Sequence, residues 1–393
     1  MSKATSQGMS QGMSEGTAVS PAAGVGTGVR ILALTGHPIE SAGARYRLIQ
    51  FFPELRRMGF QIDHESFFDS VEYSSLYKPG MLPKLRALVA GTARRAKDLV
   101  RARNYDLIWI HLWLHPITFP PFDVAIRALD VPVVYDFDDA YYDVGSVTNR
   151  LRDRNWAPRL MRRAHTVVTG SEYIRAFIQP HNSNVEILPT SIDTERFRPR
   201  DFDRERNPRP VIGWVGSQHT APYLEQVVYP VIQRLAADHD FVFRVIGAGG
   251  ATPLPGVNVE YLPWRLENEV SNFQQLDIGL YPLHDNELTR GKHGFKLNQY
   301  RAVGVPAVVS AVGLNPSIIR NGENGYIATT PEEWYAALRS LLRDESLRRR
   351  IGLACVQEVE AKASVHSVGS QLAEILKNAA ASRHTTDRGG HFT

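Results

Sequence analysis

Buried strand-like runs alternate with helical stretches twice along this chain, once on each side of a proline-rich segment. The first series opens with an apolar run at residues 29–34, and a Gly-containing loop then leads into helical apolar spacing over residues 46–58. The second series opens at residues 211–217 and continues into a helix from about Ala221. Strands that alternate with helices form a parallel sheet covered on both faces. The pattern predicts an α/β protein with two Rossmann-like, doubly wound domains facing a central cleft, where ligands bind.

Composition at the ends and in the middle of the chain sets the domain boundaries. The first residues are rich in Ser, Gly and Ala and cannot bury enough surface to offset their ordering entropy. Three prolines without apolar periodicity mark a linker. We expect a disordered tail (1–27), an N-terminal Rossmann-like domain (28–198), a linker (199–208), a C-terminal Rossmann-like domain (209–363), a C-terminal helix (364–381) and a second disordered tail (382–393).

Charge and cysteine content exclude several functional classes. The net charge of +4 over 393 residues, without interleaved basic and aromatic residues, argues against a nucleic-acid-binding protein. The single cysteine, Cys355, excludes an internal disulfide framework and a cysteine-based metal cluster, and fits a reducing cytoplasm. No run of about eighteen apolar residues is present, so no transmembrane helix is expected.

Residues 290–306 carry the strongest functional signal. Three cations, Arg290, Lys292 and Lys296, surround Gly294, after which a helix is expected to begin. The free N–H groups and positive dipole end of a helix start bind anions, and phosphate is the usual one. The segment predicts a site for the diphosphate of a nucleotide-sugar; the alternative is a basic loop with an ordinary helix cap.

A basic amphipathic helix is expected over residues 82–103. Its apolar residues are Leu82, Leu85, Val89, Leu99 and Val100. Two interpretations stay open: an outer helix of the fold with a solvated cationic face, or contact with an anionic membrane face, which would make the protein peripheral at the inner membrane.

Several short segments occur in an order that resembles one enzyme family. They are residues 171–173, 185–197, 213–217, 220–224, 290–292, 295–297, 304–306, 312–316 and 321–325. In this order, over roughly residues 29–380, the chain resembles the retaining glycosyltransferases of family 4, the glycosyl transferases group 1, which have the GT-B fold. Each segment is a weak signal by itself, whereas their joint order is specific.

The resemblance implies an enzyme that moves a sugar from a nucleotide-diphosphate sugar donor to a hydroxyl acceptor with retention of configuration. The acceptor would be a glycan, a lipid-linked glycan or a natural product. No cofactor and no metal ion are expected, because cations and helix N–H groups neutralise the leaving diphosphate. The alternatives are a non-catalytic GT-B protein that binds a nucleotide or partner, and a nucleotide-sugar epimerase or phosphorylase.

The donor-binding residues that the resemblance suggests depart from the family pattern. Family members place two carboxylates eight positions apart, where this chain has Gly291 and Gln299. A carboxamide accepts at oxygen and donates at nitrogen, so Gln299 should hold a ribose more weakly and could suit a deoxyribose, as in a thymidine-diphosphate sugar. Gly216, Ser217 and Thr220 are further candidates for phosphate binding, with helix capping as the alternative for the two hydroxyls.

Candidate catalytic residues are His111, Arg290 and Lys296. His111 ends a predicted strand and should therefore face the crevice at the carboxyl ends of the sheet, with His115 as its competitor. On the acceptor side the candidates are Gly43, Arg45, Arg47, His115, Asp138 and Asp139. The acidic run at residues 136–139 looks like a metal cluster, but acceptor binding, loop structuring and helix capping are alternatives that need no metal.

Overall fold

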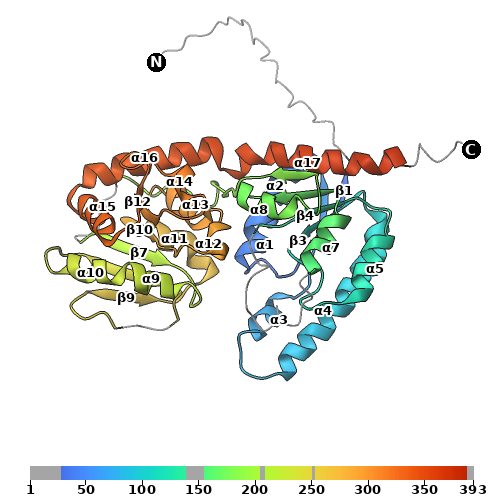
Figure 1. Ribbon diagram of the computed structural model, residues 1–393, viewed down its shortest axis with the longest axis horizontal. Helices are drawn as coiled ribbons and strands as arrows, with labels where there is room; N and C mark the ends of the chain where they lie inside the picture. Colours follow the sequence, from blue (N-terminus) through green and yellow to red (C-terminus); the bar gives the residue numbers. More distant parts are fainter. Residues whose placement is uncertain (1–27, 139–154, 204–208, 250–252, 387–393) are drawn as a thin grey trace, which may run out of the picture.

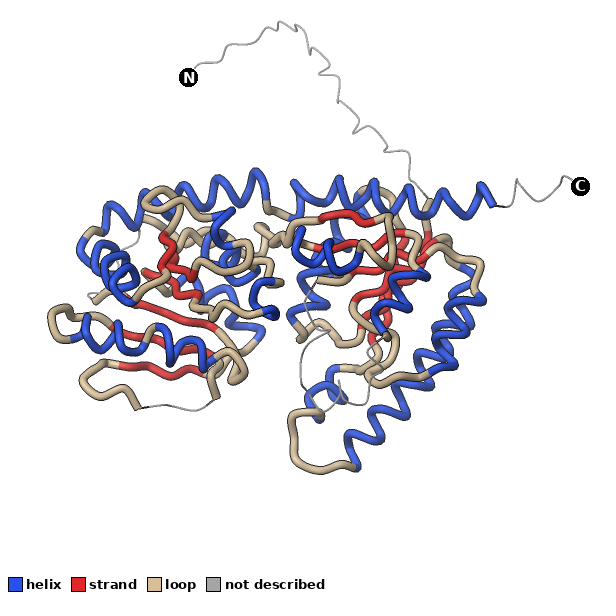
Figure 2. The backbone as a smooth tube through the Cα atoms, viewed as in Figure 1, coloured by secondary structure: helices blue, strands red, loops and turns tan. Residues whose placement is uncertain are grey.

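Two α/β domains lie side by side in the computed structural model (Figure 1). The structure describes all residues except 1–27, 139–154, 204–208, 250–252 and 387–393. Each domain contains one six-stranded sheet flanked by helices (Figure 2). The two-domain α/β architecture expected from the sequence is confirmed. No helix within the described residues is both long and apolar enough to cross a membrane.

The sheet of the N-terminal domain is parallel throughout, with the strand order β2-β1-β3-β4-β5-β6. Its strands are β1 (Arg30–Thr35), β2 (Gln61–Ser66), β3 (Leu107–His111), β4 (Val133–Asp136), β5 (Thr166–Thr169) and β6 (Val185–Ile187). The order changes direction between β1 and β3, which is where ligands bind in open parallel sheets. The register sets His111, at the end of β3, beside Thr35 of β1 and Asp136 of β4.

Helices cover both faces of this sheet. They are α1 (Ala42–Arg47), η1 (Ile49–Phe51), α2 (Phe52–Arg57), α3 (Ser70–Ser75), α4 (Leu82–Arg101), η2 (Ala102–Asn104), α5 (Pro120–Ala128), α7 (Trp156–Arg163) and α8 (Glu172–Ile178). The single helix expected over residues 46–58 is broken into α1, η1 and α2. Pro53 lies in the first turn of α2, where its missing N–H costs nothing.

The sheet of the C-terminal domain has the order β9-β8-β7-β10-β11-β12. Its strands are β7 (Val211–Val215), β8 (Val242–Ile246), β9 (Val259–Leu262), β10 (Ile278–Tyr281), β11 (Ala307–Ser310) and β12 (Tyr326–Ala328). Renumbered within the domain, this order is the 3-2-1-4-5-6 arrangement of a dinucleotide-binding fold. Its direction changes between β7 and β10, so loops after these two strands border the ligand crevice.

The helices of this half are α9 (Ala221–Val227), α10 (Tyr229–Ala236), η4 (Leu266–Asn268), α11 (Glu269–Gln274), α12 (Glu287–Arg290), α13 (Phe295–Ala302), α14 (Asn315–Ile318), α15 (Pro331–Arg343), α16 (Glu345–Lys362) and α17 (Val365–Thr386). The expected helix after Gly294 and strand over residues 307–310 are confirmed as α13 and β11. Residues 343–350 belong largely to α16, which Asp344 caps by accepting from the Leu347 N–H.

The last helix crosses back to the N-terminal domain. After α16, Val365 N donates to the carbonyl of Ile192, and α17 then packs into the core beneath β1, β3 and β4. Figure 1 shows α16 and α17 in line across both domains. The helix extends to Thr386, beyond the expected end at residue 381, and the Arg383 guanidinium donates to the Tyr105 carbonyl. Residues 382–386 are therefore helical rather than a disordered tail.

Helix α4 packs with the side opposite to its large apolar residues. Four of the five that the sequence singled out are exposed: Leu82 by 59%, Leu85 by 56%, Val89 by 62% and Val100 by 78%. The buried side is formed instead by Ala87, Gly91, Arg95, Asp98 and Leu99. A Cβ at Gly91 would lie 2.4 Å from the Phe67 ring, so the glycine permits this close approach. Helix α4 thus lies on the outside of the domain, as both interpretations require, and its outward side is apolar as well as cationic.

Candidate active site between the two domains

A cavity of about 410 Å³ lies between the two domains. The strand ends that meet there belong to β1, β4, β7 and β10, as the strand order requires. Its wall includes Glu40, Gly43, Arg45, Tyr46, Arg47, Asp138, Trp214, Gly216, Ser217, Thr220, Trp264, Glu269, Lys292, His293, Phe295, Lys296 and Gln299. Most of the candidate residues from both halves of the sequence thus line one cavity.

Two of the three predicted cations point into this cavity. Lys292 lies in the loop before α13, and Lys296 lies in its first turn. The Lys296 ammonium donates to the Val215 carbonyl and lies 5.8 Å from the centroid of the Trp214 ring. Burial, with a smaller contribution from the charge of Lys292, lowers the pKa of Lys296 to about 8. A partly desolvated ammonium gains more from an anion than a surface lysine does.

Gly294 sets the start of α13. Its φ of +66° is left-handed, a conformation that glycine adopts without strain. The first N–H groups of α13 have no side-chain cap. Phe295 and Lys296 of this first turn line the cavity, so an uncapped helix start and a lysine border it together, which is the arrangement that binds an anion.

Arg290 does not reach the cavity. Its side chain is 52% exposed and forms a two-point contact with Asp285, with Nε donating across 2.6 Å. Arg290 ends the short helix α12, and Asp285 lies just before that helix, so the pair closes on itself. The structure thus places two, rather than three, of the predicted cations at the cavity.

Gln299 faces a carboxylate that the sequence interpretation missed. Its Nε2 donates to Glu269 Oε1 at 3.3 Å and to the Tyr46 hydroxyl at 3.2 Å. Glu269 is the first residue of α11 and accepts from Arg45 of the N-terminal domain at 2.9 Å and from Arg196 at 2.7 Å. Each oxygen of this carboxylate is therefore bound by a guanidinium group. Arg45, which was predicted to bind an anionic ligand, is instead paired with Glu269 in this structure.

The glycine and hydroxyls after β7 also border the cavity. A Cβ at Gly216 would lie 2.1 Å from the Trp214 ring, so only glycine lets this ring pack here. Ser217 N donates to Thr220 Oγ1 at 3.1 Å, which closes the loop. Thr220 is the N-cap residue of α9, but its side chain makes no capping bond to that helix. The capping alternative for Thr220 is therefore not realised.

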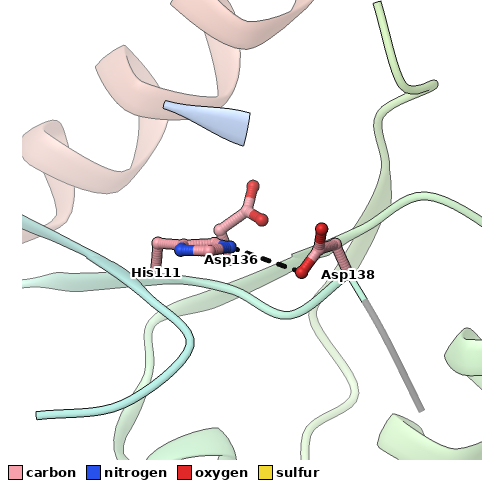
Figure 3. Close-up of side chains that lie close together, drawn as sticks. All are labelled: His111, Asp136 and Asp138. Carbon is pink, nitrogen blue, oxygen red and sulfur yellow. Dashed lines mark hydrogen bonds and ion pairs between the residues drawn. The ribbon is translucent and has the colours of Figure 1, made fainter. Parts of the chain in front are cut away.

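In the N-terminal domain, Asp138 lines the cavity and His111 contacts it. His111 Nε2 lies 3.3 Å from Asp138 Oδ1 (Figure 3). Burial raises the pKa of Asp138, but the hydrogen bond to His111 and the nearby positive charges outweigh it and lower the pKa to about 2. A Cβ at Gly43 would lie 3.0 Å from His111 Cε1, so the imidazole sits directly behind this glycine. His111 is thus one layer behind the cavity wall.

Arg47 forms a buried ion pair with Asp136. Its guanidinium contacts both oxygens of Asp136, at 2.9 and 3.0 Å, and donates to the Leu188 carbonyl. One ligand atom each from His111, Asp136 and Asp138 lies within 4.8 Å of the others, a spacing that a metal ion could span. Because the two-point pair with Arg47 occupies Asp136, this set is a poor metal site. Asp139 lies outside the described residues.

His115 belongs to a different part of the domain. Its Nε2 lies 3.0 Å from Thr92 Oγ1 on α4, and its ring stacks on Phe119 with a centroid distance of 5.0 Å. It does not line the cavity between the domains, because the loop after β3 turns it toward α4. This placement contradicts the acceptor-side prediction for His115.

His293 is a second residue that the sequence interpretation did not assign. From the loop before α13 it crosses to the N-terminal domain, where its Nε2 lies 3.3 Å from Ser171 Oγ. A Cβ at Gly170 would lie 2.3 Å from the imidazole, so the glycine makes room for it. Burial lowers the pKa of His293 to about 4, which keeps the ring neutral near pH 7. Its position within residues 290–306 was the one feature of the sequence that could have marked His293 as a site residue.

Comparison with known proteins identifies the family. Residues 209–344 match the model described as "Glycosyl transferases group 1", and residues 17–189 match the "Glycosyl transferase 4-like domain". The chain belongs to the family 4-type glycosyltransferases. As a member of this family it is a GT-B transferase that acts on a nucleotide sugar, and the fold and family expected from its sequence are confirmed.

Relatives of this glycosyltransferase include a D-inositol 3-phosphate glycosyltransferase of Corynebacterium diphtheriae, 23% identical over 81% of this chain and 86% of the relative. Among solved structures, sucrose-phosphate synthase from Thermosynechococcus elongatus has a TM-score of 0.65 at 14% identity, covering 90% of this chain and 100% of the other. Anabaena Alr3699/HepE, solved with UDP and glucose, has a TM-score of 0.63 at 17% identity, covering 89% and 100%. The likeness to these structures establishes the GT-B fold.

Proposed function

We propose that this glycosyltransferase moves a sugar from a nucleoside-diphosphate sugar to a hydroxyl acceptor with retention of configuration and without a metal ion. One observation carries the proposal: Lys292, Lys296 and the uncapped start of α13 converge on a cavity that also exposes the ionised Asp138. Cations and a carboxylate on opposite walls suit a reaction in which a diphosphate leaves while a hydroxyl arrives.

The diphosphate would lie against the start of α13. Lys292 and the Lys296 ammonium neutralise the leaving group, and the helix N–H groups bind its oxygens. Because Lys296 is already held in place by the Val215 carbonyl, it costs little further ordering when the donor binds. These groups supply the charge neutralisation for which a metal ion would otherwise serve.

The nucleoside would lie toward Gln299. Its nitrogen is used by Tyr46 and Glu269, so its oxygen is the atom that accepts a ribose hydroxyl. A single acceptor atom can bind a deoxyribose, which offers one ring hydroxyl, as well as a ribose, which offers two. A thymidine-diphosphate sugar therefore belongs in the donor screen beside uridine and guanosine donors.

The acceptor hydroxyl would approach from the N-terminal domain. Asp138 lines the cavity in its ionised form, so it can accept a hydrogen bond from the incoming hydroxyl. His111 holds Asp138 in place from behind. Attack from the face that the diphosphate leaves preserves the anomeric configuration, and the departing phosphate oxygen takes up the hydroxyl proton.

The test is incubation of the full chain with each nucleotide-sugar in the presence and absence of acceptors. Inositol 3-phosphate belongs among them, because two Corynebacterium relatives are named for it. Nucleotide release that needs an acceptor, an anomeric NMR signal that matches the donor, and activity that survives EDTA would support the proposal. Donor conversion without acceptor would indicate an epimerase, and binding without turnover would indicate a non-catalytic protein.

A matched pair of lysine variants tests the assigned cation. Lys296→Ala should cost about 2 to 4 kcal/mol of transition-state stabilisation if the ammonium acts on the leaving group. Lys362→Ala, at the exposed end of α16, should leave kcat/KM unchanged. A loss below threefold for Lys296→Ala would remove this lysine from the mechanism.

A further inference from the structure

The outward side of α4 carries a continuous apolar stripe. Leu82, Leu85 and Val89 are 59%, 56% and 62% exposed, and Val100 near the helix end is 78% exposed. Ala93 and Ala96 fill the interval at helical spacing and are also exposed. An α-helix of twenty residues is about 30 Å long, and the stripe extends along almost all of α4. We propose that this face binds the surface of an anionic lipid bilayer.

The stripe widens where α3 leads into α4. Val71, Tyr77 and Met81 are exposed by 78%, 72% and 78%. Figure 1 shows α3 and the start of α4 at the edge of the molecule opposite α17. Large apolar side chains that gather at one projecting edge mark an interaction surface, whereas scattered ones do not.

The exposed charges along α4 are cationic, whereas the two carboxylates at α3, Asp69 and Glu72, are paired with Arg94. Lys78, Arg86, Lys97 and Arg103 are exposed in and beside α4. The one carboxylate within α4, Asp98, is 2% exposed and faces Arg95 on the packed side. Apolar side chains flanked by cations on a helix surface match a bilayer with anionic headgroups, into whose boundary such a helix sinks lengthwise.

The same charges disfavour a second copy of this chain as the occupant. In a two-fold symmetric contact, α4 would meet α4 of the partner, and each cationic flank would face another cationic flank. Like charges at close range suppress such an interface, whereas anionic lipids satisfy both flanks. Packing inside the domain does not use the stripe either, because α4 packs through Ala87 and Gly91.

Binding of the full chain to vesicles tests the proposal. Vesicles that mix phosphatidylglycerol with phosphatidylcholine should bind the protein, and pure phosphatidylcholine vesicles should bind it at least about tenfold more weakly, because each basic residue near an anionic surface contributes about fivefold. Added salt should weaken the binding. The proposal is independent of the transfer reaction, since no residue of the stripe lines the cavity.

Paired variants separate the stripe from general hydrophobicity and charge. Leu85→Gln with Val89→Gln should reduce binding to the mixed vesicles by about tenfold or more. Val124→Gln changes a residue on α5 that is 56% exposed and should leave binding unchanged. Arg86→Gln with Lys97→Gln should also weaken binding, whereas Arg339→Gln on the exposed side of α15 should not.

Three results would overturn the proposal. They are absence of binding to the mixed vesicles, equal binding to both kinds of vesicle, and binding that the stripe variants leave intact while Val124→Gln reduces it. Light scattering decides the alternative: a dimer that Leu85→Gln with Val89→Gln dissociates would assign the stripe to a second copy. Because these side chains are exposed, thermal unfolding of the variants should match that of the parent chain.

Discussion

Arg45 and Glu269 form an ion pair of 2.9 Å that joins the two domains, and both side chains are almost fully buried. Arg196, just before the linker, contacts the second oxygen of the same carboxylate at 2.7 Å. Tyr46, next to Arg45, stacks on Phe295 with a centroid distance of 3.7 Å. One carboxylate thus fixes the position of both domains on this side of the cavity.

Replacing Glu269 with Gln should destabilise the protein by about 3 kcal/mol. Removing one partner of a buried ion pair leaves an uncompensated charge, here on Arg45 and partly on Arg196. Urea unfolding measures the change. The control is Glu172→Gln, which breaks the exposed pair with Arg175 and should have little effect. Similar losses of unfolding free energy for the two variants would mean that the buried pair contributes no more to stability than the exposed one.

Gln299→Glu should not improve donor binding, although it restores a carboxylate at the position where the family usually has one. The new carboxylate would lie where the Gln299 amide now meets Glu269 at 3.3 Å, and two like charges there repel each other. We expect a less stable protein with weaker nucleotide binding. Exchanging both groups, as Gln299→Glu with Glu269→Gln, should recover part of each loss. Calorimetry with nucleoside diphosphates measures it, and tighter binding by the single variant would contradict the argument.

The sequence predicts the fold well because its signals are local. Strand-length apolar runs, glycine loops and the cationic segment before α13 each depend on neighbours within a few residues, and the strand order then brings their ends together. Lys292 and Lys296 reach the cavity for that reason. Asp138 does as well, since it follows β4.

Contacts between distant segments escape such an analysis. Glu269 comes from a short helix with no motif, and its role depends on Arg45, which lies 224 residues earlier. Arg290 lies outside the cavity lining, because its guanidinium is paired with Asp285. The apolar stripe of α4 is visible in the sequence, but periodicity does not say which side of a helix meets the core when Gly91 and a buried arginine permit the opposite packing.

The dependence of activity on pH should follow Lys296. Its pKa is lowered to about 8, chiefly by burial, so the ammonium is charged below that pH and loses its proton as pH rises through it. We expect kcat/KM to fall above about pH 8, because the free enzyme then retains only Lys292 of the two lysines that would neutralise the diphosphate. Lys296→Arg should remove this fall, since a guanidinium stays charged. An unchanged alkaline limb in that variant would assign it to another group.

The dependence of stability on pH should include a contribution from His64. This histidine pairs with the Thr35 hydroxyl at 2.9 Å, and burial lowers its pKa from 6.5 to about 4. Between pH 6.5 and about 4, His64 is therefore protonated in the unfolded chain but neutral in the folded chain. Stability is full above pH 6.5 and falls by about 3 kcal/mol as pH drops toward 4. Urea unfolding at pH 7 and near 4.5 should show a smaller fall in His64→Gln than in the parent chain.

Gly43→Ala should impair catalysis without changing nucleotide binding. The added methyl would lie 3.0 Å from His111 Cε1 and would push the imidazole away from Asp138, which lines the cavity on the side of the N-terminal domain. The α13 side, where Lys296 lies, is untouched, so calorimetry should give an unaltered affinity for the nucleoside diphosphate while kcat falls about tenfold or more. The control is the same change in a His111→Ala background, in which the methyl has space and should cost nothing further. An equal loss in both backgrounds would mean that Gly43 acts by some route other than His111.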